Sequence, residues 1–351
     1  MNASSVTHGS PELEAPVEIA PGIFRVTVPV PFRSLRAVNL WLLEDGNEWV
    51  IVDTGVQSDD SKAIWELTLS GTMAARAVNR LIVTHLHPDH AGNAGWLCNR
   101  CDTGLLMTRD EYLLCRVLAG DTGRPAPDAG VNFYHAAGFP ADATDKYQKM
   151  FGMFGRMMSP LPDAYTRIQD GDVLTINRRQ WEIVIGNGHS PEHACLYCPE
   201  LNVLISGDQV LPGISSNVSV YPTEPLANPL RDWLRSIDKL AGRLPDDVLV
   251  LPAHGRPFRG VKARLAALRA EHESGLEKTE ALCQTPQRAV DVFPALFRRK
   301  IGRRELIMAT GEAIAHLNWL MAGDRVSRST DSDGVHWYQA TSANSKRANK
   351  R

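Results

Sequence analysis

The chain has 351 residues, 43% of them hydrophobic, and its 38 Lys and Arg against 40 Asp and Glu leave a formal net charge of −2. This length is enough for two domains, and the balanced charge excludes a generally basic, nucleic-acid-binding composition. No stretch reaches the roughly 18 apolar residues needed to cross a bilayer, and residues 1–5 lack the basic and apolar regions of a signal peptide. We therefore expect a cytoplasmic protein without a membrane partner, and a disordered leader over residues 1–15.

The first half of the chain predicts strands followed by a helix. Residues 23–28 are β-branched and aromatic and stop at Pro29, and residues 39–43 can pair with 49–52 across a turn. Residues 61–67 read as a helix, and the order of strands, helix and strand recurs in the second half. This order indicates an α/β fold with two sheets face to face and helices outside, an αββα sandwich.

A histidine-rich loop, Thr84-His85-Leu86-His87-Pro88-Asp89-His90, comes directly after the apolar residues 81–83. A polar surface turn is the simplest alternative, because Pro88 and Gly92 both fit turns. Three imidazoles and a carboxylate at one strand end, however, are typical of a metal site. Because alternate residues of an extended segment share a side, we expect His85 and His87 to face one metal, and Asp89 and His90 a second.

Further ligands are expected at later strand ends, because four groups cannot complete two coordination shells. Three apolar runs each end on such a residue: 181–185 leads to His189, 203–205 to Asp208 and 248–251 to His254. Junctions between strands and loops commonly carry catalytic groups in layered α/β folds.

These motifs resemble the metallo-β-lactamase superfamily, and its glyoxalase II-like hydrolase branch, over about residues 17–260. The motifs that carry the resemblance are Val52–Gly55, the histidine-rich loop, Gly188–His193, Ser206–Asp208 and Ala253–Gly255. The resemblance implies one hydrolase domain over residues 16–260 that binds two metal ions. It assigns the first ion to His85, His87 and His189, and the second ion to Asp89, His90 and His254. Asp208 would bridge the two ions. Because the β-lactamases proper lack that bridging residue, antibiotic hydrolysis becomes less favoured.

The same resemblance gives expectations for three further residues close to these motifs in the sequence. Asp53 is expected to accept a hydrogen bond that orients the histidine-rich loop, although an ordinary Asp-Thr-Gly turn fits it too. His193 is expected to support the site without binding metal. Glu192 stands where the family more often has glycine, so its side chain either narrows substrate choice or points to solvent.

The ligand types predict the chemistry. Imidazole nitrogen and carboxylate oxygen suit Zn²⁺ and would also accept iron or manganese. Two such divalent ions can share a water and lower its pKa toward neutrality. We therefore expect a hydrolase whose nucleophile is a metal-bridging hydroxide, with Asp89 and Asp208 as its catalytic carboxylates and Asp89 also relaying a proton. The expected substrate is a small acyl compound, which is a thioester, an ester or a lactone.

Two further features leave alternatives open. Residues of about 105–165 form a helical insertion rich in methionine and aromatic residues, which suits a lid over an apolar pocket or a hairpin packed on the core or on a second subunit. The six cysteines include the CxxC pairs 98–101 and 195–198. The second pair lies in an expected strand, where residues three apart face opposite sides, so we expect free, buried thiols rather than a second metal site.

The C-terminal part is expected to form a separate module. Residues 261–283 read as a linking helix, and residues 284–340 contain a helix at 309–321 and a hairpin around 331–334. This order resembles a winged-helix module, as found in hydrolases of the superfamily that include an endoribonuclease branch. With a small-molecule substrate, the module would shape the pocket or a homodimer.

In the alternative function, an endoribonuclease or phosphodiesterase, the module would bind nucleic acid. A basic cluster at 298–300, Arg303 and Arg304, together with a basic tail at 341–351, would then hold phosphates. A solvated surface explains these charges as well. A weaker alternative is a nucleic-acid-binding regulator that uses the metal site as a sensor.

Overall fold

The computed structural model describes residues 15–31 and 35–341. Apart from Ala15 and Thr341, the expected leader and the expected basic tail lie outside the described residues.

The first sheet has seven strands that lie side by side in chain order. They are β1 (Val17–Ala20), β2 (Ile23–Pro29), β3 (Ala37–Asp45), β4 (Glu48–Val52), β5 (Ala77–Ile82), β6 (Gly104–Met107) and β7 (Thr166–Arg167). Strands β1 to β4 pair antiparallel, whereas β4 to β7 pair parallel. Parallel neighbours need a crossover, which α1 (Asp59–Ser70) supplies between β4 and β5, and α2 (Pro88–Ala91) with α3 (Ala94–Cys101) between β5 and β6.

The second sheet has five strands in the order β12-β11-β10-β9-β8. They are β8 (Val173–Ile176), β9 (Arg179–Gly186), β10 (His193–Cys198), β11 (Val203–Gly207) and β12 (Leu249–Pro252). Because β9 and β11 are antiparallel to β10 while β11 and β12 are parallel, the carboxyl ends of β9, β11 and β12 share one edge.

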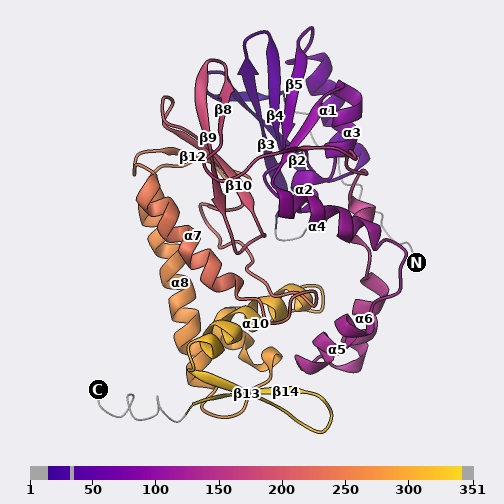
Figure 1. Ribbon diagram of the computed structural model, residues 1–351, viewed down its shortest axis with the longest axis vertical. Coiled ribbons are helices and arrows are strands. Elements are labelled where there is room, and N and C mark those ends of the chain that lie inside the picture. Colours follow the sequence, from indigo (N-terminus) through magenta and orange to yellow (C-terminus); the bar gives the residue numbers. More distant parts are fainter. Residues whose placement is uncertain (1–14, 32–34, 342–351) are drawn as a thin grey trace, which may run out of the picture.

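The two sheets pack face to face. Because successive side chains of a strand point to opposite faces of its sheet, every second side chain points into the core between the sheets. Trp41 and Leu43 of β3 point between the sheets and meet Trp181 and Leu196 of the second sheet. Their neighbours Leu40 and Leu42 point the other way, into a core with Trp65 of α1 and Leu97 of α3. On the outside of the second sheet, Leu204 packs in a cluster with Trp233 of α7 (Pro229–Arg243) and Leu265 of α8 (Val261–Leu282). These layers confirm the αββα sandwich (Figure 1).

The same alternation separates the second CxxC pair. Cys195 belongs to the outer cluster and Cys198 to the core between the sheets, so the two thiols point to opposite faces of β10. The thiols of all six cysteines are free. The predictions of opposite faces for Cys195 and Cys198 and of free thiols are therefore confirmed.

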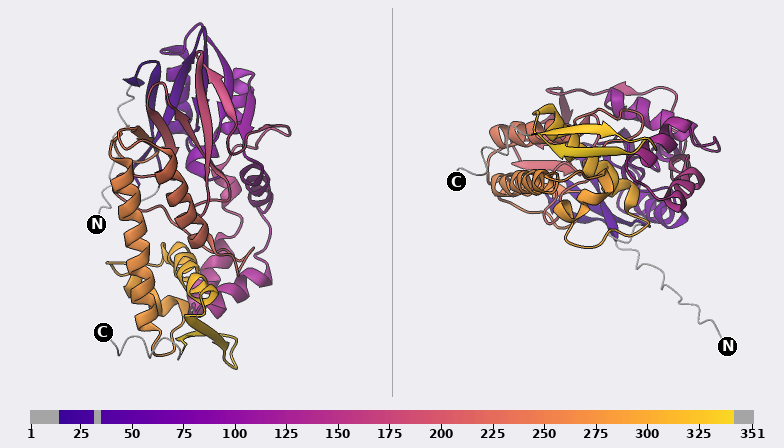
Figure 2. Two further views of the ribbon diagram at one scale, coloured as in Figure 1. Left: turned by 60° about the vertical axis from the view of Figure 1, so that its left-hand side comes forward. Right: turned by 90° about the horizontal axis from the view of Figure 1, so that it is seen from below.

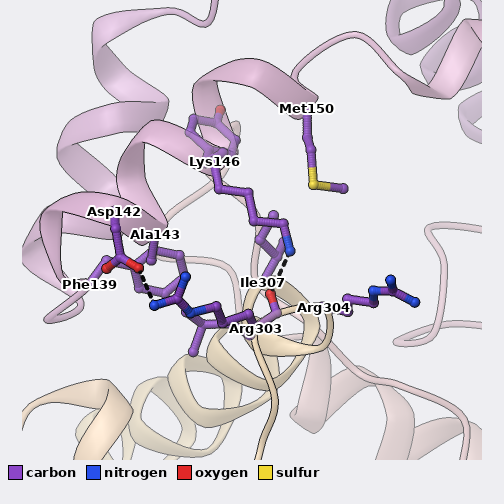
Figure 3. A pocket seen from close by; sticks show the side chains of 10 residues that line it. Phe139, Asp142, Ala143, Lys146, Met150, Arg303, Arg304 and Ile307 are labelled. Atoms are coloured by element: carbon purple, nitrogen blue, oxygen red, sulfur yellow. Dashed lines mark hydrogen bonds and ion pairs between the residues drawn. The ribbon is translucent and has the colours of Figure 1, made fainter. Parts of the chain in front are cut away.

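The insertion after β6 packs on the C-terminal part of the chain. Its helices are α4 (Arg109–Gly120), α5 (Asp128–Ala136), α6 (Ala141–Met150) and the 3₁₀ turn η1 (Phe154–Met157). The helices therefore begin later than the expected residue 105, because residues 105–107 belong to β6. Tyr134 and Tyr147 pack with Leu306 and Ile307, and the Lys146 ammonium donates to the carbonyl of Arg303 at 3.0 Å. A small cavity lies at this junction (Figure 3). Helices α5 and α6 thus rest on the C-terminal helices, a partner that neither alternative had named, whereas Tyr112 and Cys115 of α4 are buried in the core beside the first sheet, as the alternative of packing on the core expects.

The C-terminal part begins with α8, which matches the expected linking helix at 261–283. It continues through η2 (Ala289–Val292), α9 (Phe293–Leu296), α10 (Leu306–Ala322), β13 (Val326–Thr330) and β14 (His336–Ala340). The last two strands form the expected antiparallel hairpin. Helix α8 runs from the sandwich to these elements, so that α10 lies across from the edge at which the strands of both sheets end (Figures 1 and 2). In the described part of the chain, no helix combines the length and apolarity that a bilayer span requires.

Candidate metal centre

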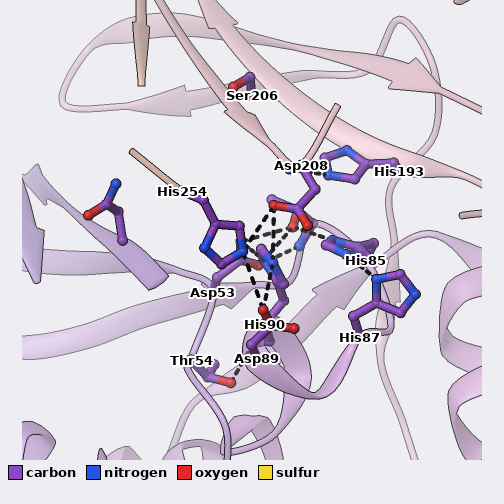
Figure 4. A network of polar contacts seen from close by, with 12 residues as sticks. Asp53, Thr54, His85, His87, Asp89, His90, His193, Ser206, Asp208 and His254 are labelled. Atoms are coloured by element: carbon purple, nitrogen blue, oxygen red, sulfur yellow. Dashed lines mark hydrogen bonds and ion pairs between the residues drawn. The ribbon is translucent and has the colours of Figure 1, made fainter. Parts of the chain in front are cut away.

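The seven ligands expected from the sequence lie together at one edge of the sandwich. All of them except His189 are labelled in Figure 4. The histidine-rich loop follows β5, and His189, Asp208 and His254 follow β9, β11 and β12. Sheet topology explains the meeting, since the carboxyl ends of these four strands point to the same edge. Their ligand atoms fall into two groups, and within each group all atoms lie within 4.8 Å of one another.

The first group holds three imidazoles and one carboxylate oxygen. His85 Nε2 lies 2.9 Å from His87 Nδ1 and 3.3 Å from His189 Nε2. His189 Nε2 in turn lies 3.4 Å from Asp208 Oδ2. These nitrogens and the oxygen point at a common centre rather than at separate partners.

The second group adjoins the first through the same aspartate. His254 Nε2 lies 3.3 Å from Asp89 Oδ2 and 3.5 Å from Asp208 Oδ1. His90 Nε2 also lies 3.5 Å from Asp208 Oδ1. Asp208 therefore turns one oxygen toward each group.

Buried polar atoms without hydrogen-bond partners indicate that the site is suited to bind cations. Among the described residues, Nε2 of His90, Nε2 of His254 and Oδ1 of Asp208 are buried without a hydrogen-bond partner. Buried polar atoms without partners are costly and therefore rare in folded proteins. All three atoms face the second group, where a cation would supply the missing partner. The first group offers the same kinds of donor, three imidazole nitrogens and a carboxylate oxygen, and such donors suit a divalent metal. The residues thus fit a pair of metal ions.

The protonation of the two groups differs. Burial, and then the neighbouring imidazoles, lower the pKa of His85 well below its usual range, and burial lowers that of His87 to about 3. Both rings are therefore neutral at pH 7 and keep a lone pair for a metal. At His90 burial acts in the same direction, but Asp53, Asp208 and Asp89 outweigh it and raise the pKa well above its usual range. A metal entering the second group would displace that proton.

Asp53 and Ala37 orient the histidines of the second group. The Asp53 carboxylate accepts hydrogen bonds from the Thr84 amide at 2.8 Å and the Thr84 hydroxyl at 2.9 Å, and it lies 2.8 Å from His90 Nδ1. His254 Nδ1 lies 2.8 Å from the carbonyl oxygen of Ala37, which can only accept. With hydrogen on Nδ1, the neutral form of each ring has its lone pair on Nε2, toward the site.

His193 lies beside both groups without joining either. Its Nε2 accepts a hydrogen bond from the Asp208 amide at 3.0 Å, and its ring stacks on that of His85 with centroids 4.6 Å apart. This placement agrees with the supporting role expected for it.

Glu111, which the sequence did not single out, joins the two histidine-bearing loops. Its buried carboxylate accepts hydrogen bonds from the Leu86 amide at 2.9 Å, the Ser190 hydroxyl at 2.5 Å and the Glu192 amide at 2.8 Å. Burial raises the pKa of Glu111 to about 7, although the three donors favour its charged form. The sequence carried no signal for this role, because Glu111 looks like one polar residue of an amphipathic helix.

The Glu192 side chain binds the start of helix α4. Its carboxylate accepts a hydrogen bond from the Asp110 amide in the first turn of α4 at 3.0 Å. An acidic side chain at a helix N-terminus satisfies a free amide and complements the helix dipole. The side chain thus holds α4, and with it Glu111, against the loop of His189.

An αββα sandwich with two adjoining histidine and aspartate groups at one sheet edge defines a class of metal-dependent hydrolases. The family model of the metallo-beta-lactamase superfamily matches residues 33–254, and a model described as metallo-beta-lactamase-like, C-terminal domain, matches residues 276–341. The chain belongs to the metallo-β-lactamase superfamily and is a hydrolase of that superfamily.

Three similar proteins extend this result. The crystal structure of a beta-lactamase domain protein from Burkholderia ambifaria superposes with a TM-score of 0.84 at 37% identity, over 95% of this chain and 96% of that one. Probable metallo-hydrolase YqjP of Bacillus subtilis is 21% identical over 90% of this chain and 97% of its own length. Acyl-coenzyme A thioesterase MBLAC2 of Homo sapiens is 26% identical over 65% of this chain and 76% of its own length.

Proposed function

We propose that this protein hydrolyses acyl thioesters with two divalent metal ions, Zn²⁺ being the first to test. The proposal of two metal ions rests on the orientation of the Asp208 carboxylate. Its Oδ2 faces His189 of the first group, while its Oδ1 faces His90 and His254 of the second. A site for one ion would not need a carboxylate shared in this way.

Each residue has a definite task in this proposal. His85, His87 and His189 hold one ion, Asp89, His90 and His254 hold the other, and Asp208 binds both. When bound, the ions would lower the pKa of a water and stabilise negative charge on the attacked acyl oxygen. Asp89 is buried with one oxygen toward His254, and in this proposal its carboxylate relays a proton as well as binding metal.

The substrate class rests on similarity and on the composition of the insertion. The similar human protein is named an acyl-coenzyme A thioesterase, and the motifs around the site resemble the glyoxalase II-like branch. Met150 and Met153 of the insertion are exposed and offer apolar surface that suits an acyl group, whereas Tyr134 and Tyr147 are buried against the C-terminal helices. Esters and lactones present the same carbonyl and are the next substrates to test.

The endoribonuclease alternative is less favoured because two arginines of the basic cluster are already paired. Arg299 pairs with Glu305 at 2.5 Å, and Arg303 pairs with Asp142 at 2.7 Å (Figure 3). A winged-helix function of the C-terminal module therefore stays a prediction.

A substrate panel tests the proposal. Metal-free protein is reloaded with zinc, iron or manganese and assayed on acyl thioesters, esters, lactones, a phosphodiester and a structured RNA, with Asp208→Ala as the control. We expect thioester hydrolysis that requires metal and is lost in the control. Cleavage of RNA alone would replace the proposal with the nuclease alternative, and equal turnover by Asp208→Ala would overturn the two-metal mechanism.

A further inference from the structure

The backbone carbonyl that orients His189 lies on a loop outside the sandwich layers. His189 Nδ1 lies 2.8 Å from the carbonyl oxygen of Asn217. A carbonyl oxygen can only accept, so Nδ1 carries the hydrogen and Nε2 is left with its lone pair toward the first metal group. By contrast, the acceptor for His254 is Ala37, within strand β3 of the sandwich. The position of the loop that contains Asn217 therefore decides how one ligand of the first group points.

This loop is fastened to α10 of the C-terminal part by both side chains and backbone. The Asn217 amide group donates to Glu312 Oε2 at 2.9 Å, and the Ser219 hydroxyl lies 2.5 Å from Asn217 Oδ1 and 3.2 Å from the carbonyl oxygen of Met308. The Val220 amide donates to the carbonyl oxygen of Gly311 at 3.0 Å. Burial raises the pKa of Glu312 to about 7, although the bond from the Asn217 amide group favours its charged form.

The close approach of the loop to α10 depends on a glycine. A Cβ added at Gly311 would lie 2.7 Å from side-chain atoms of Ser219 and 2.9 Å from the Val220 carbonyl oxygen. Val218 and Val220 of the loop are buried in the cluster that includes Ala313 and Leu317 of α10. Packing and hydrogen bonds therefore fix the same register between loop and helix.

We propose that Glu312 and Asn217 are positioning residues of the first metal group, through which the C-terminal helix α10 sets the orientation of His189. The proposal rests on the proposed function, because it assumes that His189 binds metal. It assigns the C-terminal part a role in metal affinity that requires no contact with substrate. Partners that orient a metal-binding histidine typically change metal affinity by about 10- to 100-fold when they are removed.

The experiment measures metal binding rather than turnover. Metal-free full-length protein is titrated with Zn²⁺ against a competing chromophoric chelator, and with Co²⁺ while its visible absorption is recorded. We expect Glu312→Ala and Asn217→Ala to weaken one of the two binding steps by about 10- to 100-fold and to change the cobalt spectrum of that step. The other step should stay unchanged.

Two matched variants separate positioning from loss of structure. Glu312→Gln keeps an oxygen that accepts from the Asn217 amide group, so it should bind both metals nearly as the wild type does. Met308→Ala removes a side chain that is 54% exposed on the same helix and leaves the backbone carbonyl in place, so it should change neither binding step. The unfolding midpoint of each metal-free variant is measured alongside.

Three results would decide against the inference. If the Glu312→Ala variant binds both metals as tightly as the wild type does, α10 does not set the orientation of His189. Glu312→Gln as weak as Glu312→Ala would show that the hydrogen bond is not the cause. A wild-type protein that takes up no metal would overturn the proposed function, and this inference with it.

Discussion

Replacement of Glu111 by alanine offers the most direct test of how the site is assembled. The side chain joins the histidine-rich loop to the loop of His189 by accepting three hydrogen bonds, two of them from backbone amides. Alanine would leave the buried amide of Leu86 and the partly buried amide of Glu192 without an acceptor. Because Leu86 is 4% exposed, water cannot easily replace the acceptor that its amide loses.

The magnitude follows from the number of donors left unpaired. A buried donor that loses its acceptor costs about 1–3 kcal/mol, so two amides and a hydroxyl together should cost about 3–9 kcal/mol of unfolding free energy. Typical domains have only about 5–15 kcal/mol in total. Because His85, His87 and His189 all lie on the two loops, the first metal group should loosen even where the protein stays folded.

Urea unfolding of the metal-free protein and zinc titration against a chelator measure the two effects separately. Asp110→Ala is the matched control, since Asp110 is the exposed neighbour whose side chain faces solvent. Glu111→Gln should fall between wild type and Glu111→Ala, because an amide offers one accepting oxygen in place of two. A loss below about 1 kcal/mol together with wild-type zinc affinity would refute the role of Glu111.

Three further predictions concern other parts of the structure. Asp208→Asn should weaken metal binding by more than the about 100-fold typical of supporting residues, and elemental analysis after gel filtration should then find fewer than two ions per chain. Asp53→Asn should lower metal affinity by about 10- to 100-fold while urea titration still shows one cooperative transition, and unaltered affinity would count against its orienting role. Burial, and at His272 the neighbouring His316, lower the pKa of His272 to about 3, and burial lowers that of His316 to about 4. Both rings are neutral in the fold and take up protons on unfolding below about pH 6.5, so their contribution to stability is present above that pH and is lost as pH falls toward 4 and 3. His272→Leu should therefore flatten unfolding free energy against pH in this window by up to about 1.4 kcal/mol per pH unit, and an unchanged slope would contradict the buried neutral state.

The sequence by itself determined the layers and the ligand-bearing strand ends. Residues 40–43 and 49–52 are short, continuous apolar runs, so strands buried on both faces could be predicted without coordinates. The candidate ligands could be located because each follows an apolar run within a few residues, whereas their division between two metals came from the resemblance to the superfamily. The opposite faces of Cys195 and Cys198 also followed from strand geometry alone.

Only the tertiary structure decided what lies against these elements. Packing brings distant loops together and so decides three features of the site. Asp208 turns one oxygen toward each metal group, Glu111 accepts three hydrogen bonds, and the Asn217 carbonyl faces His189. The local sequence around these residues does not predict any of the three. Docking of α6 on the start of α10 is of the same kind, because an apolar face predicts burial but not the partner that covers it. Periodicity fixes the direction in which a side chain points, whereas hydrogen bonds between distant loops depend on positions that only the assembled core defines.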